Sequence, residues 1–286
     1  IVLDQVTSSL RPLKEGFTTE KGYPPDMFVS SERALELTDY NTLVMVVDVN
    51  RPSHTECPGL LKRTDSIVVF DHHRQSSEVI SNPVLSYIEP YASSTCEMVA
   101  EVLQYFTENI KLAPHEADCI YAGILIDTSN FMTKTGVRTF EAAAYLKRCG
   151  AEVTRVRKML RNDMDAYKAR AEVVRHAEVY RGAFAISICP ADKIESPTIV
   201  GAQAADELLN IVGIKASFVL TEYQGKIYVS SRSIDEINVQ KIMERLGGGG
   251  HLNMAGCQLR DCTVSQAQRI IEDTIDEMLE EGDIEE

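Results

Sequence analysis

The stretch SIVVFDHHRQ, residues Ser66 to Gln75, joins a short apolar run directly to three titratable side chains. Its apolar part is rich in β-branched residues, which is typical of a strand buried on both faces of a parallel sheet. A second run of this kind, Leu43–Val47, also stops at an aspartate, Asp48. Because ligands bind at the carboxyl ends of strands in an open parallel sheet, these two strand ends mark a candidate site.

Helix-like segments alternate with these strands, which predicts an α/β domain. Residues from about 152 to 180 have a charged helical pattern and are expected to connect two domains. From Gly182 the pattern changes to three strands and a final helix, which predicts a second, smaller α/β domain. The expected organisation is a first domain over residues 1–160, a helical linker over 161–181 and a second domain over 182–286.

Composition narrows the class of protein. The chain has 286 residues, of which 44% are hydrophobic, and its formal net charge of −14 opposes binding of long nucleic acids, which requires a dense basic stripe. No apolar run is long enough to cross a membrane, and the seven cysteines form no C-x-x-C pair. We therefore expect a soluble, cytoplasmic portion with reduced thiols. A small anionic substrate fits this charge if metal ions supply local positive charge.

Asp48 and the trio Asp71, His72 and His73 offer both carboxylate and imidazole ligands. This mixture suits manganese, cobalt or zinc better than magnesium or calcium, which prefer all-oxygen ligands. A single aspartate at a strand end is usually a turn residue, but two polar strand ends in one sheet favour a metal site. Asp127, after the apolar segment Ile124–Ile126, is a further candidate, although taken alone it is better explained as a cap for the following turn.

The stretch GGGGHLNMAG, Gly247 to Gly256, contains four successive glycines. A flexible linker is one explanation. We favour a loop whose exposed N–H groups bind phosphate, with His251 at its rim, because so many glycines are costly without a need for unusual backbone conformations. Arg232 ends a predicted strand of the same domain and is a candidate for pairing with phosphate or stacking on a base.

Five motifs in this order resemble those of the DHH-type phosphoesterases with a DHH-associated C-terminal domain. They are VVDVNRPS, FDHHRQ, YIEPYASSTCEMV, GILIDTSNFMTKTGVRTFEAAAYL and GGGGHLNMAG. The likeness is greatest to the catalytic part of GdpP-type enzymes, which hydrolyse cyclic di-AMP. It implies a parallel-sheet DHH domain, a smaller α/β domain, and two manganese ions per site, with cobalt or other divalent ions as substitutes.

The resemblance also implies roles for individual residues. Asp48 matches the aspartate that bridges the two ions, and His72 and Asp127 match further metal ligands. Asp71 matches the residue that holds the His72 ring, and His73 matches the residue that faces the phosphate. The substrate-binding residues that the resemblance implies are Arg232, Gly248, Gly249, Gly250, His251, Ser94 and Thr95.

One departure from the family affects the expected activity. The family begins with His-x-x-x-Asp-x-Asp, which supplies three further ligands, and this sequence contains no such pattern. Ile1–Val6 resembles the strand that comes next in the family, and Asn50 stands where relatives often have histidine. We therefore expect the chain by itself to bind metal poorly and to be inactive.

The function implied is manganese-dependent hydrolysis of cyclic di-AMP to linear pApA in bacterial second-messenger turnover. The resemblance also implies a homodimer and a parent protein anchored to the cell membrane. Two alternatives stay open: a nanoRNase or pAp phosphatase that acts on short oligonucleotides, and a catalytically incomplete nucleotide-binding fragment. A two-domain manganese pyrophosphatase fits less well, because the Gly-rich His loop and the length of the second domain match the phosphodiesterases better.

Overall fold

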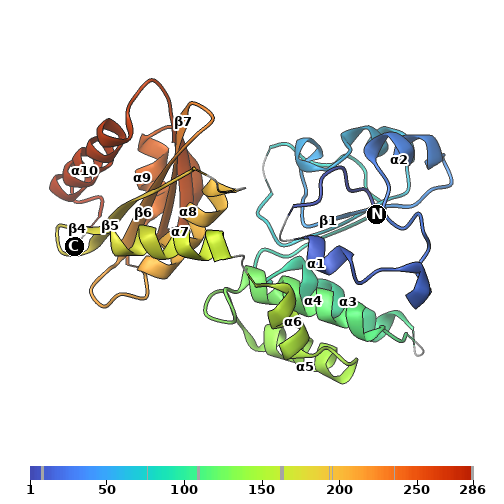
Figure 1. Ribbon diagram of the computed structural model, residues 1–286. Coiled ribbons are helices and arrows are strands. Elements are labelled where there is room, and N and C mark those ends of the chain that lie inside the picture. Colours follow the sequence, from blue (N-terminus) through green and yellow to red (C-terminus); the bar gives the residue numbers. More distant parts are fainter. Residues whose placement is uncertain are drawn as a thin grey trace. The chain divides into compact units, whose positions relative to one another are not determined.

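The chain forms two compact units, residues 1–161 and 162–286, each with its own sheet and hydrophobic core (Figure 1). The structure is a computed structural model that describes residues 1–7, 10–75, 77–107, 110–161, 164–192, 194, 196–234 and 236–284. Among these residues, no helix is both long and apolar enough to cross a membrane.

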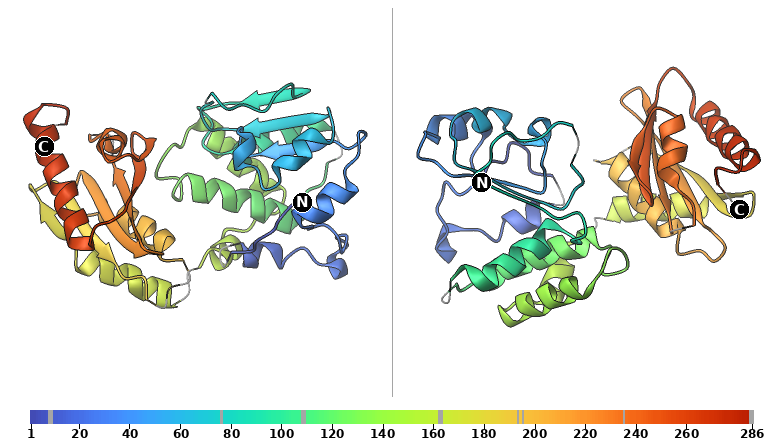
Figure 2. Two further views of the ribbon diagram at one scale, coloured as in Figure 1. Left: turned by 90° about the horizontal axis from the view of Figure 1, so that it is seen from above. Right: turned by 180° about the vertical axis from the view of Figure 1, so that it is seen from behind.

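The first unit combines a parallel three-stranded sheet, in the order β1–β2–β3, with a layer of helices that Figure 2 shows beside it. Its strands are β1 (Val44–Val47), β2 (Ile67–Asp71) and β3 (Leu85–Ile88). Its α-helices are α1 (Arg11–Lys14), α2 (Ser31–Leu37), α3 (Thr95–Phe106), α4 (Pro114–Asp127), α5 (Val137–Arg148) and α6 (Val153–Met159). Its 3-10 helices are η1 (Thr19–Lys21), η2 (Pro52–His54) and η3 (Pro58–Lys62).

Strand β2 is buried on both faces, as its β-branched sequence predicts. Val69 packs with Val46 in one apolar cluster, and Phe70 packs with Met98 of α3 in another. Strand β1 differs from the prediction, because Met45 and Val47 are more than half exposed. The difference arises because β1 is the edge of the described sheet and α3 packs on β2.

The helical layer places α3 beside both α4 and α5. Ser94 caps α3 by accepting a hydrogen bond from the backbone N–H of Glu97 at 3.0 Å. Gly123 lets α3 and α4 approach closely, since a Cβ at this position would lie 2.2 Å from Cys96 Sγ. The N-terminus of α3 and the C-terminus of α4 are thereby fixed against each other.

The second unit is a six-stranded sheet in the order β4–β5–β6–β7–β9–β8, with helices on both faces (Figure 1). Strands β5 and β6 are parallel, and the other neighbours are antiparallel. The strands are β4 (Glu178–Tyr180), β5 (Phe184–Cys189), β6 (Ala216–Tyr223), β7 (Lys226–Ser233), β8 (Gly249–His251) and β9 (Met254–Leu259). The helices are α7 (Met164–Arg175), α8 (Pro197–Leu208), α9 (Val239–Arg245) and α10 (Val264–Glu280).

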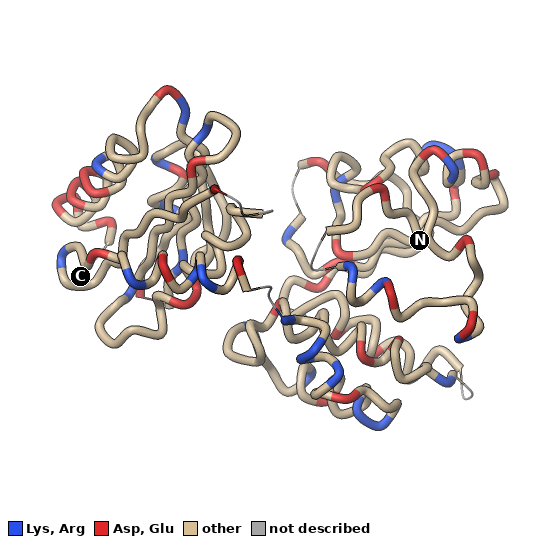
Figure 3. Tube along the Cα trace, viewed as in Figure 1, with Lys and Arg blue, Asp and Glu red and all other residues tan. Residues whose placement is uncertain are grey.

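Two apolar clusters cover opposite faces of this sheet. One includes Ile242 of α9 and Ile271 of α10, and the other includes Val173 of α7 and Val200 of α8. Most of the predicted linker therefore packs as part of the second unit, because α7 covers the sheet and β4 pairs with β5. Figure 3 shows Lys and Arg interspersed with Asp and Glu along the described parts of both units.

Several short elements differ from the sequence-based expectations. Residues 1–6, expected to form a strand, make a single bridge between Val2 and Val29. Strands β3, β8 and β9 and helices α8 and α9 were not predicted, because their runs are short or broken by glycine and proline. None of these differences changes the α/β class of either unit.

Candidate metal centre

The parallel pairing of β1 and β2 brings two polar strand ends together. Val47 lies opposite Phe70 in the register, and the N–H of Asp48 donates to the carbonyl oxygen of Phe70 at 2.9 Å. Asp48 and His72 thus follow adjacent strands at the same edge of the sheet. Asp127, the last residue of α4, lies beside them.

His72 is the centre of this arrangement. Its Nδ1 lies 3.4 Å from the carbonyl oxygen of Ala92, which can only accept, so Nδ1 carries the proton. Its Nε2 lies 3.6 Å from Asp48 Oδ1 and 3.9 Å from Asp127 Oδ2. A nitrogen lone pair facing two carboxylates is unfavourable unless a proton or a cation lies between them. This geometry favours a cation site.

Asp48 is held in place by backbone and side-chain contacts. Its φ of 66° is in the left-handed region, which aspartate tolerates better than most residues. Thr95, the first residue of α3, donates from Oγ1 to Asp48 Oδ1 at 2.9 Å. The carboxylate is thereby fixed at the positive end of a helix, where negative charge is favoured.

Asp127 occupies a less favourable place for a carboxylate. Burial raises the pKa of Asp127 above its usual range, and the charge of Asp48 raises it further. Ser129, Asn130 and Phe131 after it all have left-handed φ values, so the turn that follows is strained. Since a metal ligand must lose its proton, binding at Asp127 is expected to strengthen as the pH rises through this raised pKa.

The role predicted for Asp71 is wrong. Asp71 is fully buried and its Oδ1 accepts from the Nδ1 of His73 at 2.7 Å, so it holds His73 and not His72. The chain turns directly after β2, and Asp71 Oδ1 also accepts from the backbone N–H of His73 at 3.1 Å, which holds residue 73 beside it. Asn50 completes the contact by donating to Asp71 Oδ2 at 2.6 Å and to the His73 carbonyl at 3.1 Å.

Asp71 and His73 shift each other's pKa. Burial by itself would raise the pKa of Asp71, but the hydrogen bonds from His73 and Asn50 lower it below the ordinary 3.8. The hydrogen bond to Asp71 raises the pKa of His73 above the ordinary 6.5, against the effect of burial, and Asp48 and Asp127 add to this rise. His73 therefore keeps its proton to a higher pH than a free histidine.

This pair predicts a pH dependence of stability for the metal-free protein. A raised histidine pKa stabilises the fold fully below pH 6.5, and this contribution is lost as the pH rises through the pKa of folded His73. The free energy of unfolding, measured by denaturant titration, should thus decline above pH 6.5, and His73→Gln should flatten that decline. The exposed His54 provides the control variant His54→Gln, and an equal effect of both substitutions would contradict the assignment.

The residues present fit a divalent transition metal. Asp48, His72 and His73 each place a ligand atom within 4.8 Å of the others, and the mixture of carboxylate and imidazole suits manganese, cobalt or zinc. The buried Oδ1 of Asn50 has no hydrogen-bond donor among the described residues, and such an atom is ordinarily satisfied by water or a ligand. Asp48 and His72 could hold such an ion, together with His73 from this group or with Asp127, whose Oδ2 lies 3.9 Å from His72 Nε2.

The glycine stretch does not form the predicted loop of exposed N–H groups. Gly247 and Gly248 donate to the Glu244 and Met243 carbonyls at the end of α9, and Gly249–His251 forms β8. Gly248 and Gly250 are needed for close contact with β9, since added Cβ atoms would lie 2.2 Å from Gly256 O and 2.4 Å from Met254 O. The stretch is therefore the end of a helix followed by an edge strand, and the predicted contact of these glycines with phosphate stays a prediction.

The other predicted substrate-binding residues have partners within the chain. Arg232 donates from Nε to Asp206 Oδ1 at 2.8 Å, and its side chain is largely buried. Ser94 Oγ caps α3, and Thr95 Oγ1 donates to Asp48. His251 lies exposed at the end of β8.

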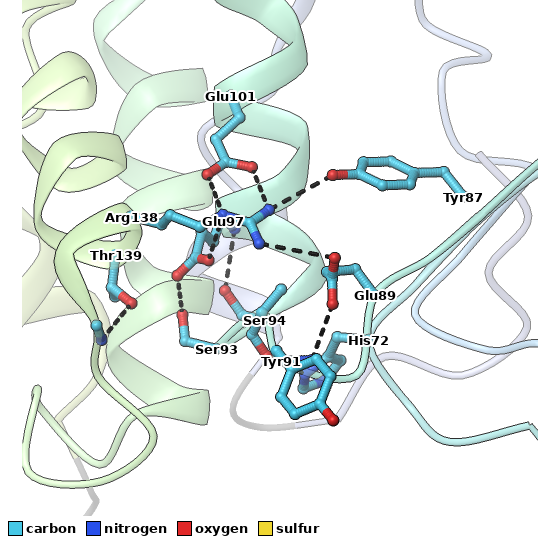
Figure 4. Close-up of polar contacts among 12 residues, drawn as sticks. His72, Tyr87, Glu89, Tyr91, Ser93, Ser94, Glu97, Glu101, Arg138 and Thr139 are labelled. Carbon is cyan, nitrogen blue, oxygen red and sulfur yellow. Dashed lines mark hydrogen bonds and ion pairs between the residues drawn. The ribbon is translucent and has the colours of Figure 1, made fainter.

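The sequence analysis missed the residues that orient the candidate ligands without being ligands themselves. The carbonyl oxygen of Ala92 fixes the His72 ring, and a backbone group carries no sequence signal. Arg138 on α5 joins the acidic residues around the same segment, as Figure 4 shows. The only signal that could have indicated Arg138 is the need for a cation near Glu97, because a buried carboxylate is ordinarily paired with a positive charge.

Comparison with known proteins agrees with this division of the chain. The model of the DHH family, N-terminal domain, matches residues 3–124, and that of the DHHA1 domain matches residues 184–281. The chain is 44% identical over 255 residues to cyclic-di-AMP phosphodiesterase GdpP of Geobacillus thermodenitrificans, and 42% identical over 249 residues to cyclic-di-AMP phosphodiesterase PdeA of Listeria monocytogenes. These alignments cover 89% and 87% of this chain but 39% and 38% of the relatives, so the chain spans about two fifths of their length.

A solved structure shares the fold along almost the whole chain. An exopolyphosphatase-related protein from Bacteroides fragilis aligns with a TM-score of 0.77 over 95% of this chain and 88% of its own, at 18% sequence identity. Two findings show the family of this chain: the order of the two matched domains and the sequence identity to the curated relatives. The chain therefore belongs to the DHH family, with an N-terminal DHH domain followed by a DHHA1 domain.

Proposed function

We propose that the chain is the catalytic portion of a manganese-dependent phosphodiesterase that hydrolyses cyclic di-AMP to linear pApA. The observation that carries this proposal is His72 Nε2 facing the carboxylates of Asp48 and Asp127. The identity of the proposed substrate is taken from two relatives, cyclic-di-AMP phosphodiesterases that align over 87–89% of this chain. We further propose that the active form is a homodimer and that this portion lies at the cytoplasmic side of a membrane-anchored protein.

The mechanism assigns a task to each residue at the strand ends. Divalent ions held by Asp48, His72 and Asp127 would activate water and stabilise the charge that develops on the phosphate. Thr95 and Ala92 orient Asp48 and His72 before any ligand binds. His73 is half exposed and retains its proton through Asp71, which suits it to hydrogen-bond an anionic phosphate oxygen.

We also propose Arg232 and His251 as nucleotide contacts in the second unit. Arg232 keeps its orientation through Asp206, so its remaining guanidinium N–H groups are presented in a fixed direction. The close approach of Gly248 and Gly250 to β9 fixes the hairpin that carries His251. The glycines thus act on substrate binding through the shape of this hairpin.

The test is hydrolysis by the purified protein, as residues 1–286 and as the full-length product of its gene. We expect the full-length product to convert cyclic di-AMP to pApA with manganese, and a chelator to abolish the reaction, as measured by chromatography of the products. Cleavage of short oligonucleotides or pAp without cleavage of cyclic di-AMP would replace this proposal with the nanoRNase alternative. Tight binding of cyclic di-AMP without hydrolysis would favour a nucleotide-binding module.

A further inference from the structure

Arg138, the second residue of α5, lies at the centre of an acidic cluster in the first unit (Figure 4). Its Nε and Nη2 each donate to one carboxylate oxygen of Glu101 at 2.8 Å, a bidentate pair. Nη2 also lies 3.4 Å from the hydroxyl oxygen of Tyr87. This geometry fixes the plane of the guanidinium group between α5, α3 and β3.

Two further carboxylates face the same guanidinium group. Arg138 Nη1 lies 3.8 Å from Glu89 Oε2, and Nε lies 3.9 Å from Glu97 Oε1. Glu97 is 1% exposed, and Ser93 Oγ donates to its other oxygen. Burying a carboxylate without a cation nearby is costly, so the guanidinium group of Arg138 offsets the cost of burying Glu97.

Glu89 and Glu97 stand at the two ends of the segment that supports the metal centre. Glu89 also accepts from the N–H of Tyr91 at 3.2 Å, next to Ala92. Between these ends, the Ala92 carbonyl accepts from His72 Nδ1, and Thr95 Oγ1 donates to Asp48. Each of these groups orients a different ligand of the candidate centre.

We infer that Arg138 is a positioning residue for the metal centre, which acts by clamping both ends of the segment 89–97. It contacts none of the proposed ligands, and its effect passes through Ala92 to His72 and through Thr95 to Asp48. The inference rests on the proposed function in one respect, since it takes the centre to bind a divalent ion.

The chain offers a matched control in Arg155 on α6. Arg155 forms a bidentate pair with Asp118, with Nε 2.6 Å from Oδ2 and Nη2 3.2 Å from Oδ1, and Asp118 is 1% exposed like Glu97. Arg155 also donates to the Gly150 carbonyl, and among the described residues its hydrogen-bond and ion-pair partners, Asp118 and Gly150, both lie outside the segment 89–97. Its loss is expected to cost stability without changing the centre.

The experiment compares Arg138→Met, Arg138→Lys and Arg155→Met in the full-length protein. Manganese affinity is measured by calorimetry, the free energy of unfolding by denaturant titration, and the tautomer of His72 by ¹⁵N spectra of the metal-free protein. We expect Arg138→Met to weaken manganese binding by about 10-fold or more, as is typical when support behind a ligand is lost. We also expect it to mix the His72 tautomers, whereas Arg155→Met keeps both properties of the wild type.

Each outcome decides the inference. Wild-type manganese affinity and an unchanged His72 tautomer in Arg138→Met would overturn it, as would an equal loss of affinity in Arg155→Met. If Arg138→Met does not fold, Arg138→Lys carries the test, because lysine keeps the charge for Glu97 but cannot form the bidentate pair. If the wild type binds no manganese, the proposed function fails, and the His72 tautomer still tests the positioning by Arg138.

Discussion

Asp48→Asn is expected to reduce the rate of manganese-dependent hydrolysis by about 100-fold or more. Replacing a residue that only orients a metal ligand typically lowers metal affinity or activity by about 10–100-fold, and replacing the ligand itself costs more. Asparagine has nearly the same shape, and its Oδ1 can still accept the hydrogen bond from Thr95 Oγ1. The variant therefore removes the negative charge and leaves the geometry in place. The measurement is the rate of cyclic di-AMP cleavage by the full-length protein at saturating manganese.

Stability separates this effect from a loss of folding. Asp48 and Asp127 repel each other across the metal-free site, and the Asp48 charge contributes to the raised pKa of Asp127. Without metal, the free energy of unfolding of Asp48→Asn should thus be higher than that of the wild type or equal to it within about 0.5 kcal/mol.

The control is Asp65→Asn, an exposed carboxylate just before β2, which should change neither activity nor stability. Full hydrolysis in Asp48→Asn would sink the metal-ligand assignment. A loss of activity that parallels a loss of folding would sink it equally, because the substitution would then act on the fold.

Gly250→Ala should produce the largest loss of stability in the second unit. Its φ of 150° is rarely adopted by residues with a side chain, and a Cβ there would lie 2.4 Å from Met254 O and 2.5 Å from Ala255 Cα. Backbone strain and overpacking each cost about 1–3 kcal/mol, so we expect a loss of about 3 kcal/mol. In thermal unfolding this corresponds to a decrease of roughly 10 °C in Tm.

Neighbouring glycines test the cause of this loss. Gly249→Ala is the matched control, because no atom lies within 4 Å of its added Cβ, and we expect a change below about 0.5 kcal/mol. Gly248→Ala should resemble Gly250→Ala, with its Cβ 2.2 Å from Gly256 O. Equal stability of the position 249 and 250 variants would contradict close backbone contact as the reason for the glycines.

The apolar runs predicted the longer elements well, because burial and side-chain periodicity are local properties of the sequence. Strands β1, β2, β5, β6 and β7 and helices α4 and α10 lie close to their predicted positions. Strand β8 could not be predicted, since Gly249 and Gly250 have no strand propensity and are extended only through pairing with β9. Exposure of β1 was also missed, because an edge strand and a central strand have the same apolar sequence.

For the candidate site, the sequence indicated the polar strand ends but not all the contacts between them. The resemblance assigned Asp71 to the ring of His72, whereas the structure pairs Asp71 with His73, two positions away in the turn after β2. Aspartate side chains commonly accept from the backbone N–H two residues on, so this local contact could have been predicted from the sequence. The contact between Asn50 and Asp71 could not have been predicted from the sequence, because it depends on the pairing of two strands.

The sequence by itself determined the two α/β domains, the family and the residue types at the strand ends, because local hydrophobic patterns and motif order carry this information. Only the tertiary structure placed His72 Nε2 between Asp48 and Asp127 and connected the segment behind them to Arg138. These contacts join β1, β2, α3, α4 and α5, which are far apart along the chain. Their geometry depends on packing between elements, such as the close approach of α3 and α4 at Gly123, and no local pattern encodes it.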